Sequence, residues 1–175
     1  MTLDVDATRV RGTWVKHAPP GLPPLPTRTD PPDNRWQRGS VVDAIYLADD
    51  EATAWAEWYR HLAENGIPPG QALPRDLWRW RVDVEVADLS TEARLARVGL
   101  PLPTPGSHSW PPFQEVGEQL WREGWRRLIA PSAARPAGAT LCLFWEGEDE
   151  IDGAQPQPPP ERIDEPPIPP TGMTT

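Results

Sequence analysis

The stretch Leu77–Ala87, LWRWRVDVEVA, decides how this chain folds. Its apolar positions are Trp78, Trp80, Val82, Val84 and Val86, and charged residues stand between them. Because successive side chains of a strand point to opposite faces, this alternation predicts a strand with one buried and one polar face. Two more strands are predicted at Val41–Ala48 and Thr140–Trp145, the second almost wholly apolar and therefore central. Gly12–Ala18 is a weaker strand candidate.

Helical periodicity appears in three places. After Asp49 and Asp50, either of which can cap a helix, Trp55, Trp58, Tyr59 and Leu62 repeat at the spacing of one helix face, and Gly66 marks the stop. Further helices are predicted at Pro112–Arg127 and Thr91–Val98. Since strands and helices mix without regular alternation, the predicted class is α+β, with a central mixed β core and flanking helices.

The 25 prolines and 10 tryptophans occupy different parts of the chain. All tryptophans lie between Trp14 and Trp145, which predicts a folded domain over residues 8–147. Seven prolines between Pro19 and Pro32 indicate a long, stiff loop inside that domain. Eight more fall within residues 148–175, a stretch with no aromatic residue. We therefore expect an acidic, proline-rich tail that is disordered.

Composition excludes several classes of function. At 175 residues the chain has the length of one domain, and its net charge of −9 argues against a general nucleic-acid binder or a protein of anionic membranes. It contains no apolar run of the roughly 20 residues that span a bilayer. The polar, acidic stretch Met1–Val10 is not a secretory signal, and the single cysteine, Cys142, fits a reducing, cytoplasmic compartment.

Familiar catalytic motifs are missing from the sequence. It has no glycine-rich phosphate loop and no Gly-x-Ser-x-Gly element. His17, His61 and His108 are scattered without metal-ligand spacing, so no metal site is expected. Cys142 lies in an apolar run, which favours burial over a nucleophilic role.

Three other segments stand out together. They are Asn34–Gly39 (NRWQRG), Ala44–Glu57 (AIYLADDEATAWAE) and Leu128–Arg135 (LIAPSAAR), the last followed by an apolar strand. In this order and spacing they resemble the RES domain, which is named for its arginine, glutamate and serine. That family has an arginine-tryptophan pair before a strand ending in Tyr-Leu-Ala, a helix carrying a glutamate, and a late Pro-Ser element. The resemblance covers about residues 9–146.

The resemblance implies an ADP-ribosyltransferase-like fold and an enzyme that degrades NAD⁺. Characterised members are toxins of toxin–antitoxin pairs that cleave the nicotinamide–ribose bond as an NAD⁺ glycohydrolase or NAD⁺ phosphorylase, with water or phosphate as acceptor. Their partner is an Xre-type antitoxin protein that blocks the active site. NAD⁺ is then the substrate, and no separate cofactor is expected. Carried over by position, the catalytic residues are Arg35, Tyr46, Glu57 and Ser132.

The chemistry of these side chains suits the implied reaction. Loss of nicotinamide leaves an oxocarbenium-like ribose, which a fixed carboxylate such as Glu57 stabilises. The planar donor fork of Arg35 matches phosphate oxygens, and Tyr46 offers a flat face to nicotinamide. Ser132 is suited to bind the nicotinamide amide or to position Arg35. Taken alone, Glu57 also reads as an ordinary exposed helix residue, Tyr46 as core, and Ser132 as a turn residue after Pro131.

Lys16 departs from the family pattern, because relatives commonly carry an arginine there. A lysine in contact with phosphate keeps the charge but loses the bidentate geometry, which predicts weaker activity than in typical members; a solvent-facing strand residue is the other interpretation. Two alternatives to the implied activity stay open. One is an ADP-ribosyltransferase that modifies a macromolecule, and the other is a non-catalytic binding module. The sequence also leaves a homodimer open.

Overall fold

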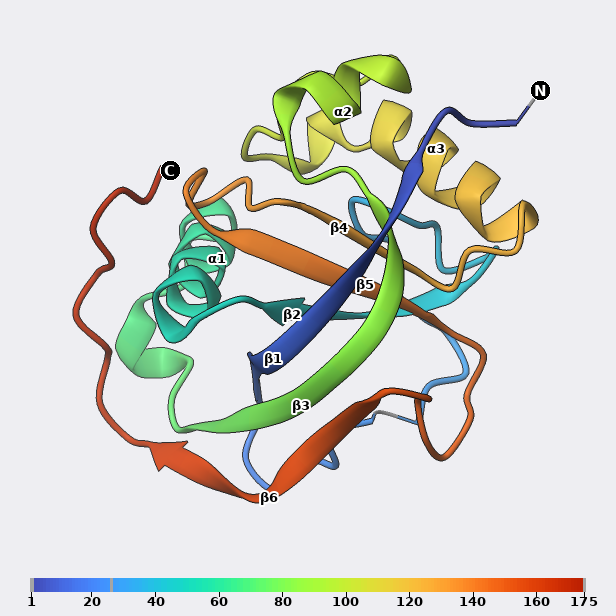
Figure 1. The fold of residues 1–175 in the computed structure, drawn as a ribbon. Coiled ribbons are helices and arrows are strands. Elements are labelled where there is room, and N and C mark those ends of the chain that lie inside the picture. The colour runs from blue at the N-terminus through green and yellow to red at the C-terminus, as the bar shows by residue number, and fades with distance from the viewer. Residues whose placement is uncertain (1, 26, 175) are drawn as a thin grey trace.

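The computed structural model describes residues 2–25 and 27–174. Figure 1 shows one long, curved sheet with helices above it and at one end. The strands are β1 (Asp6–Ala18), β2 (Asp43–Ala48), β3 (Arg75–Asp88), β4 (Arg127–Pro131), β5 (Ala139–Trp145) and β6 (Ala154–Ile163), and the α-helices are α1 (Glu51–Glu64), α2 (Glu92–Arg97) and α3 (Pro111–Arg122). The predicted α+β class is confirmed, and β3 and β5 are close to their predicted extents.

The sheet is mixed and curls back on itself. Its order is β1-β2-β5-β4-β3-β6, and a further pairing joins β1 to β3 along their full lengths. Among the described residues, β3 and β4 form the one parallel pair. Strand β5 lies between β2 and β4, which confirms its predicted central place. Strands β1 and β2 pair through a single residue pair, Val15 and Ala48. The two strands therefore separate on either side of this pair.

Burial follows the alternation seen in the sequence. Along β3 the buried side chains Trp80, Val82, Val84 and Val86 face a core shared with β1 and β5, whereas Arg79, Arg81, Asp83 and Glu85 are exposed. Trp78 is the exception, because it is only half-buried. The strand is therefore amphipathic in the predicted register.

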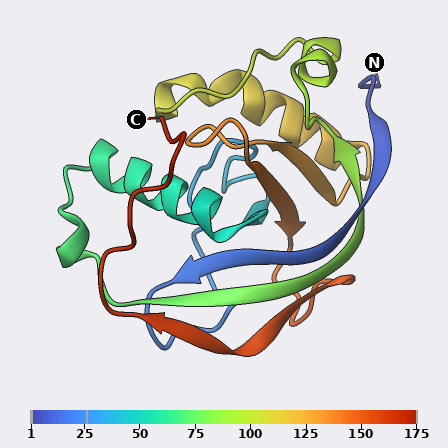
Figure 2. The same cartoon turned by 60° about the vertical axis from the view of Figure 1, so that its left-hand side comes forward.

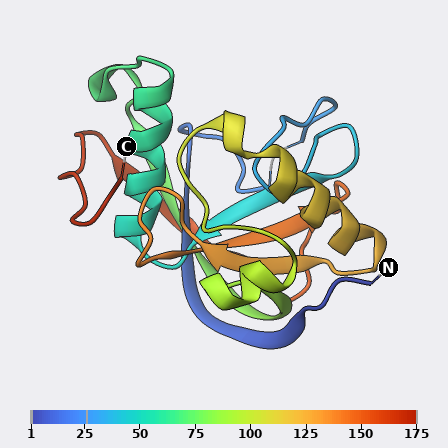
Figure 3. The same cartoon turned by 90° about the horizontal axis from the view of Figure 1, so that it is seen from above.

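The helices cover two separate parts of the sheet, as Figure 3 shows from above. Helices α2 and α3 pack on a core with β2, β4 and β5, while α1 packs its Trp55, Trp58 and Leu62 against Val15 and Leu77. Asp50 caps α1 by accepting a hydrogen bond of 2.6 Å from the Thr53 amide. The part of the chain that the structure describes contains no helix long and apolar enough to cross a membrane.

The helix predicted at Pro112–Arg127 is shorter than expected. It ends at Arg122, because Gly124 takes a φ of 91° that breaks the helix. The chain then turns and forms β4, a strand that the sequence pattern did not separate from the helix. The Pro19–Pro32 stretch carries no helix or strand in its described residues, which confirms the predicted loop.

The prediction that residues 148–175 are disordered is wrong for residues 154–163, which form strand β6. Strand β6 pairs antiparallel with one half of the free edge of β3, from Val82 paired with Ala154 to Arg75 paired with Ile163. Order here comes from that open edge rather than from apolar side chains of the segment itself. Arg162 also binds the buried Asp76 carboxylate at 2.5 Å. The prolines of β6 are compatible with an edge strand, whose outward side needs no amide donors.

Helix α3 sets the position of the loop before β2. The Gln114 side chain donates to the Asn34 carbonyl oxygen at 2.9 Å, and Glu118 binds Arg38 at 2.9 Å. Gly117 lies so close to the loop that an added Cβ would stand 1.9 Å from the Trp36 carbonyl oxygen. The Asn34–Arg38 turn is therefore fixed against α3 before it reaches the cavity described next.

Candidate active site

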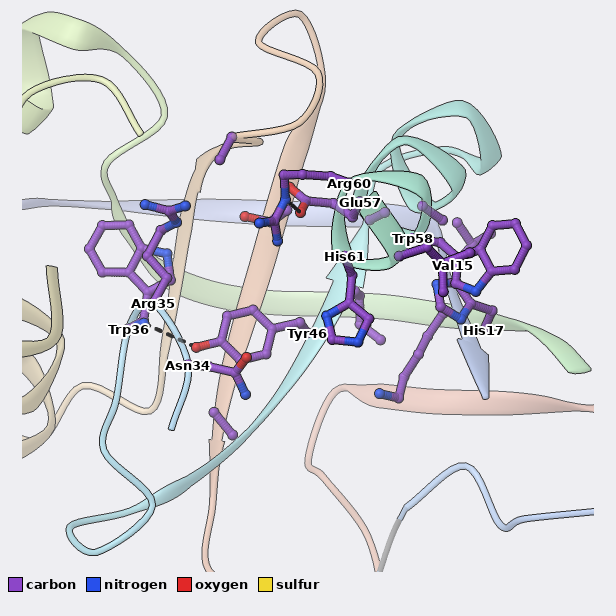
Figure 4. Close-up of a pocket in the computed structure, with 18 of the residues that line it drawn as sticks. Val15, His17, Asn34, Arg35, Trp36, Tyr46, Glu57, Trp58, Arg60 and His61 are labelled. Carbon is purple, nitrogen blue, oxygen red and sulfur yellow. Dashed lines mark hydrogen bonds and ion pairs between the residues drawn. The ribbon is translucent and has the colours of Figure 1, made fainter. Parts of the chain in front are cut away.

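A cavity of about 500 Å³ opens where β1 and β2 separate, with α1 as one wall. Its size lies within the range of small-molecule sites. Figure 4 shows its wall, to which β1, β2, α1 and the Asn34–Trp36 turn contribute. The charged and histidine residues that line it are Lys16, His17, Arg28, Arg35, Glu57, Arg60, His61 and Arg75. One carboxylate thus faces several cationic side chains.

Arg35 lies at one end of the cavity and is held from behind. Its guanidinium donates to the Thr104 carbonyl oxygen at 2.7 Å and to the Ser109 hydroxyl at 3.2 Å, and it stacks over the Phe113 ring at 5.2 Å. Burial lowers the pKa of Arg35 to about 10, and the Glu57 carboxylate opposes that shift. Arg35 is a fixed cation within electrostatic reach of Glu57.

The Tyr46 hydroxyl is fully engaged by the neighbouring turn. It donates to the Gln37 side-chain oxygen at 2.5 Å and accepts from the Trp36 amide at 3.2 Å. Burial raises the pKa of this hydroxyl well above its ordinary value. Tyr46 therefore holds the turn that carries Arg35 and presents its ring, rather than a free hydroxyl, to the cavity (Figure 4).

Glu57 is the carboxylate of the site. It lies in the second turn of α1, half-buried, and its Oε1 accepts a 2.6 Å hydrogen bond from the Ser132 hydroxyl. A longer contact of 3.4 Å comes from the Ala134 amide. Its Oε2 accepts from Arg60 Nε at 3.1 Å. This carboxylate is fixed in orientation by two separate segments of the chain.

Ser132 stands behind Glu57 rather than in the cavity wall. It is 1% exposed, and its hydroxyl oxygen also accepts from the Ala134 and Arg135 amides at 3.2 and 3.1 Å. A neutral hydroxyl that accepts two amide bonds keeps its proton for the carboxylate. The expected role of Ser132 toward nicotinamide stays a prediction; in the structure its hydroxyl contacts Glu57 and supports that carboxylate.

Lys16 lies in the cavity wall on β1, at some distance along the cavity from Arg35. Burial lowers its pKa to about 8, and the nearby Arg28 and Arg75 guanidinium groups add to the shift. Arg28 binds Asp43 at 2.8 Å, but the described residues offer no ion pair to Lys16 or Arg75. The solvent-facing interpretation of Lys16 does not fit this position. The wall here is a cationic patch in which Asp43 pairs with Arg28, while Lys16 and Arg75 have no ion pair among the described residues.

Several residues of the cavity wall were not predicted from the sequence. Arg28 comes from the proline-rich loop, and Arg75 opens β3; neither lies in a motif, and only the fold brings them beside Lys16. Arg60 could have been predicted from the sequence, because it follows Glu57 by three residues, the spacing at which helix side chains meet. His17 is stacked on Trp55 at 5.2 Å and accepts from Arg75, and burial lowers its pKa to about 3, so it stays neutral.

The last eleven residues of the described chain run back to this site. We call residues 164–174 the C-terminal strap; it leaves β6 and passes α1 toward the Ser132–Arg135 turn (Figure 2). Thr174 donates from its amide to the Ala134 carbonyl oxygen at 2.7 Å and from its hydroxyl to the Ala133 carbonyl oxygen at 2.9 Å. The Tyr59 hydroxyl donates to the Pro167 carbonyl oxygen. The strap therefore covers the turn that holds Glu57.

Comparison with known proteins defines the class to which this fold and site belong. The sequence model of the RES domain matches residues 7–165, almost the whole chain. The protein belongs to the RES domain family. The match includes β6, so the domain extends beyond the predicted end at residue 147.

Two individual proteins give the comparison detail. A Mycobacterium tuberculosis (strain ATCC 25618 / H37Rv) protein named as a probable NAD(+) phosphorylase is 27% identical over 156 residues, which cover 86% of this chain and 74% of the relative. A chain in the crystal structure of the M. tuberculosis MbcT–MbcA toxin–antitoxin complex superposes with a TM-score of 0.76 at 21% identity. That match covers 91% of this chain and 86% of the other. The fold is therefore one that a toxin–antitoxin complex also contains.

Proposed function

We propose that this protein degrades NAD⁺ by breaking the bond between nicotinamide and ribose, with inorganic phosphate as the preferred acceptor. The observation that carries the proposal is the fixed Glu57 carboxylate in a cavity whose other charged groups are cations. Membership of the RES family and the similarity to a probable NAD(+) phosphorylase point in the same direction. The proposal includes that the fold is similar to that of ADP-ribosyltransferases.

In the proposed reaction the bond between the anomeric ribose carbon and the nicotinamide ring nitrogen breaks. Both electrons of that bond go to the nitrogen, so nicotinamide leaves as a neutral molecule. The ribose carbon becomes positive, and Glu57 stabilises that charge from a fixed position. A phosphate oxygen then supplies the electron pair of the new carbon–oxygen bond. Water gives the hydrolytic product instead and releases one proton.

The cationic wall supports an anionic substrate and an anionic acceptor together. NAD⁺ brings a pyrophosphate, for which Arg35 supplies a planar donor fork at one end of the cavity. Lys16 and Arg75, which lie elsewhere along the wall, add positive charge beyond what one pyrophosphate needs. This surplus favours phosphate over water as the acceptor. Tyr46 is assigned to the nicotinamide ring, through its face.

A nicotinamide-release assay tests the proposal. Purified protein incubated with NAD⁺ should release nicotinamide faster with inorganic phosphate present, and Glu57→Gln should lower the rate by a factor of about 100 or more. Glu51→Gln, on the same helix but outside the cavity, is the matched control and should keep the wild-type rate. Absence of release above the Glu57→Gln background would reject both enzymatic readings and favour a binding module. Labelled ADP-ribose left on a macromolecule would indicate the transferase.

We further propose that the protein acts in the cytoplasm as the toxin of a toxin–antitoxin pair, with an Xre-type antitoxin as its partner. The shared fold with a chain of the MbcT–MbcA complex motivates this. Expression without the partner should arrest growth and lower cellular NAD⁺, whereas Glu57→Gln should do neither. Equal growth arrest by that variant would count against the mechanism.

A further inference from the structure

The second oxygen of the Glu57 carboxylate is occupied by a cation of the same helix. Arg60 Nε donates to Glu57 Oε2 at 3.1 Å, and Arg60 Nη1 donates to Glu64 Oε1 at 2.6 Å. The Arg60 side chain is only 11% exposed, less than either of its two partners. Figure 4 shows the Arg60 guanidinium against Glu57, on the cavity side of α1.

This ion pair works against the chemistry that Glu57 is proposed to perform. A carboxylate stabilises a positive ribose carbon through its negative charge, and an arginine in contact with it compensates part of that charge. In the structure Oε1 is already bound by Ser132, so Oε2 is the oxygen left to face a substrate. An active complex therefore needs Arg60 to leave Oε2 or to be compensated by an added anion.

Arg60 also belongs to an arrangement that attracts anions. It lines the same cavity as Arg35, and the two guanidinium groups are close enough that Arg60 contributes to lowering the pKa of Arg35, while Glu57 and Glu64 oppose that effect. Burial is the larger cause of the Arg35 shift. Both guanidinium groups are half-buried in the wall of one cavity, so an anion between them interacts favourably with both. The guanidinium fork matches the oxygens of phosphate, so a phosphate group is the anion best suited to this place.

We propose that Arg60 is an exchangeable cap on Glu57, which a phosphate group draws away from Oε2 and which then binds that phosphate. Glu64 keeps hold of Nη1, so the guanidinium rotates within the site instead of leaving it. One event thereby binds the anion and exposes the carboxylate. No covalent bond changes in this step, since only ion pairs are exchanged. The inference rests on the proposed function, because it assumes that Glu57 acts on NAD⁺.

The test measures nicotinamide release from NAD⁺ over a series of inorganic phosphate concentrations, with wild type, Arg60→Gln and Arg60→Lys. We expect Arg60→Gln to raise the half-saturating phosphate concentration at least tenfold, which corresponds to about 1.4 kcal/mol. The rate without phosphate should rise, because Glu57 is no longer capped. Arg60→Lys, which keeps the charge but not the fork, should fall between the two. A purely structural role would lower the rate equally at every phosphate concentration.

The control is Arg79→Gln. Arg79 also pairs with two glutamates, Glu51 and Glu161, one of them on α1, but it lies outside the cavity. This variant should keep the wild-type phosphate response. An unchanged phosphate response in Arg60→Gln, or a uniform loss of rate, would overturn the cap.

Calorimetric titration of inorganic phosphate separates this inference from the proposed function. Arg60→Gln should weaken phosphate binding at least tenfold even if no variant turns over NAD⁺. A wild type that releases no nicotinamide would reject the proposed function, and the titration would still decide whether Arg60 binds phosphate. Equal phosphate affinity of wild type and Arg60→Gln would reject the cap alone.

Discussion

Lys16 is a residue of the site whose charge changes near pH 8. It is surrounded by Arg28 and Arg75, with Asp43 as the one nearby acid, and the neutral His17 follows it in the chain. Because its pKa in the folded protein is about 8 instead of 10.5, the amine is charged below pH 8 and neutral above it. Between these two values the unfolded chain binds more protons, so this group makes stability rise with pH there.

Substrate binding, unlike stability, should weaken as pH rises. As pH rises through about 8, Lys16 loses its charge, and the KM for NAD⁺ should increase, by about threefold or more at pH 9. Lys16→Arg keeps the charge at every pH and should remove the rise. Initial rates between pH 6.5 and 9 measure this directly. A rise of the same size in Lys16→Arg would show that another group causes it.

At this scale the sequence predicts the motif residues better than their partners. Arg35, Tyr46 and Glu57 were found from their order in the chain, and all three reach one cavity. Ser132 was also found, but its contact to Glu57 depends on how β4 meets α1, which no local pattern reports. Arg75 carries no motif at all, and it reaches the site because β3 runs beside β1.

At the scale of elements, the strap is the feature that links the end of the described chain to the site. Thr174 binds two carbonyl oxygens of the Ser132–Arg135 turn, and Arg135 donates in return to the Thr171 carbonyl oxygen at 3.4 Å. The same Arg135 reaches Asp50 at the start of α1. The turn behind Glu57 is thus held from two sides.

Removing the strap should therefore affect activity more than stability. A chain that ends at residue 163 keeps β6 but loses these contacts, and we expect kcat to fall about tenfold while Tm falls by only a few degrees. Ile168→Ala is the control, because that side chain is 90% exposed and outside these contacts. Thr174→Val tests the hydroxyl alone and should give a smaller loss. A truncated protein with wild-type kcat would show that the turn holds Glu57 unaided.

The elements that the sequence missed share one cause. Strand β4 has only five residues, too few for a clear alternation in its sequence, and it lies between β3 and β5, whereas β6 takes its order from the edge of β3. Both strands exist through pairing with distant segments. Composition therefore predicted the tryptophan-rich core correctly, but it also predicted a disordered proline-rich end in which the structure contains β6.

At the scale of the whole molecule, β3 is the strand on which the other parts depend. It pairs with β1, β4 and β6, and its two ends reach different cores: Leu77 packs with α1, and Ala87 packs with α2 and α3. Trp80, which is fully buried, lies between these ends. Because all three cores share this strand, we expect the domain to unfold as one unit.

Trp80→Ala should lower the free energy of unfolding by about 3–5 kcal/mol, the cost of a large cavity in a core. Denaturant unfolding followed by circular dichroism in the near and far ultraviolet should give a single coincident transition at lower denaturant. Leu22→Ala, at a side chain that is 51% exposed, should change the free energy by less than about 0.5 kcal/mol. Two separated transitions in Trp80→Ala would contradict the single unit.

The tryptophans that mark the core also surround the site. Trp36, Trp58 and Trp110 line the cavity, and Trp55 stacks on His17 in its wall. The indole nitrogen of Trp110 is buried without a hydrogen-bond partner among the described residues. A molecule that fills the cavity changes the polarity beside these indoles and with it their emission. The protein thus contains its own fluorescent reporter of occupancy, placed at the proposed binding site and independent of turnover.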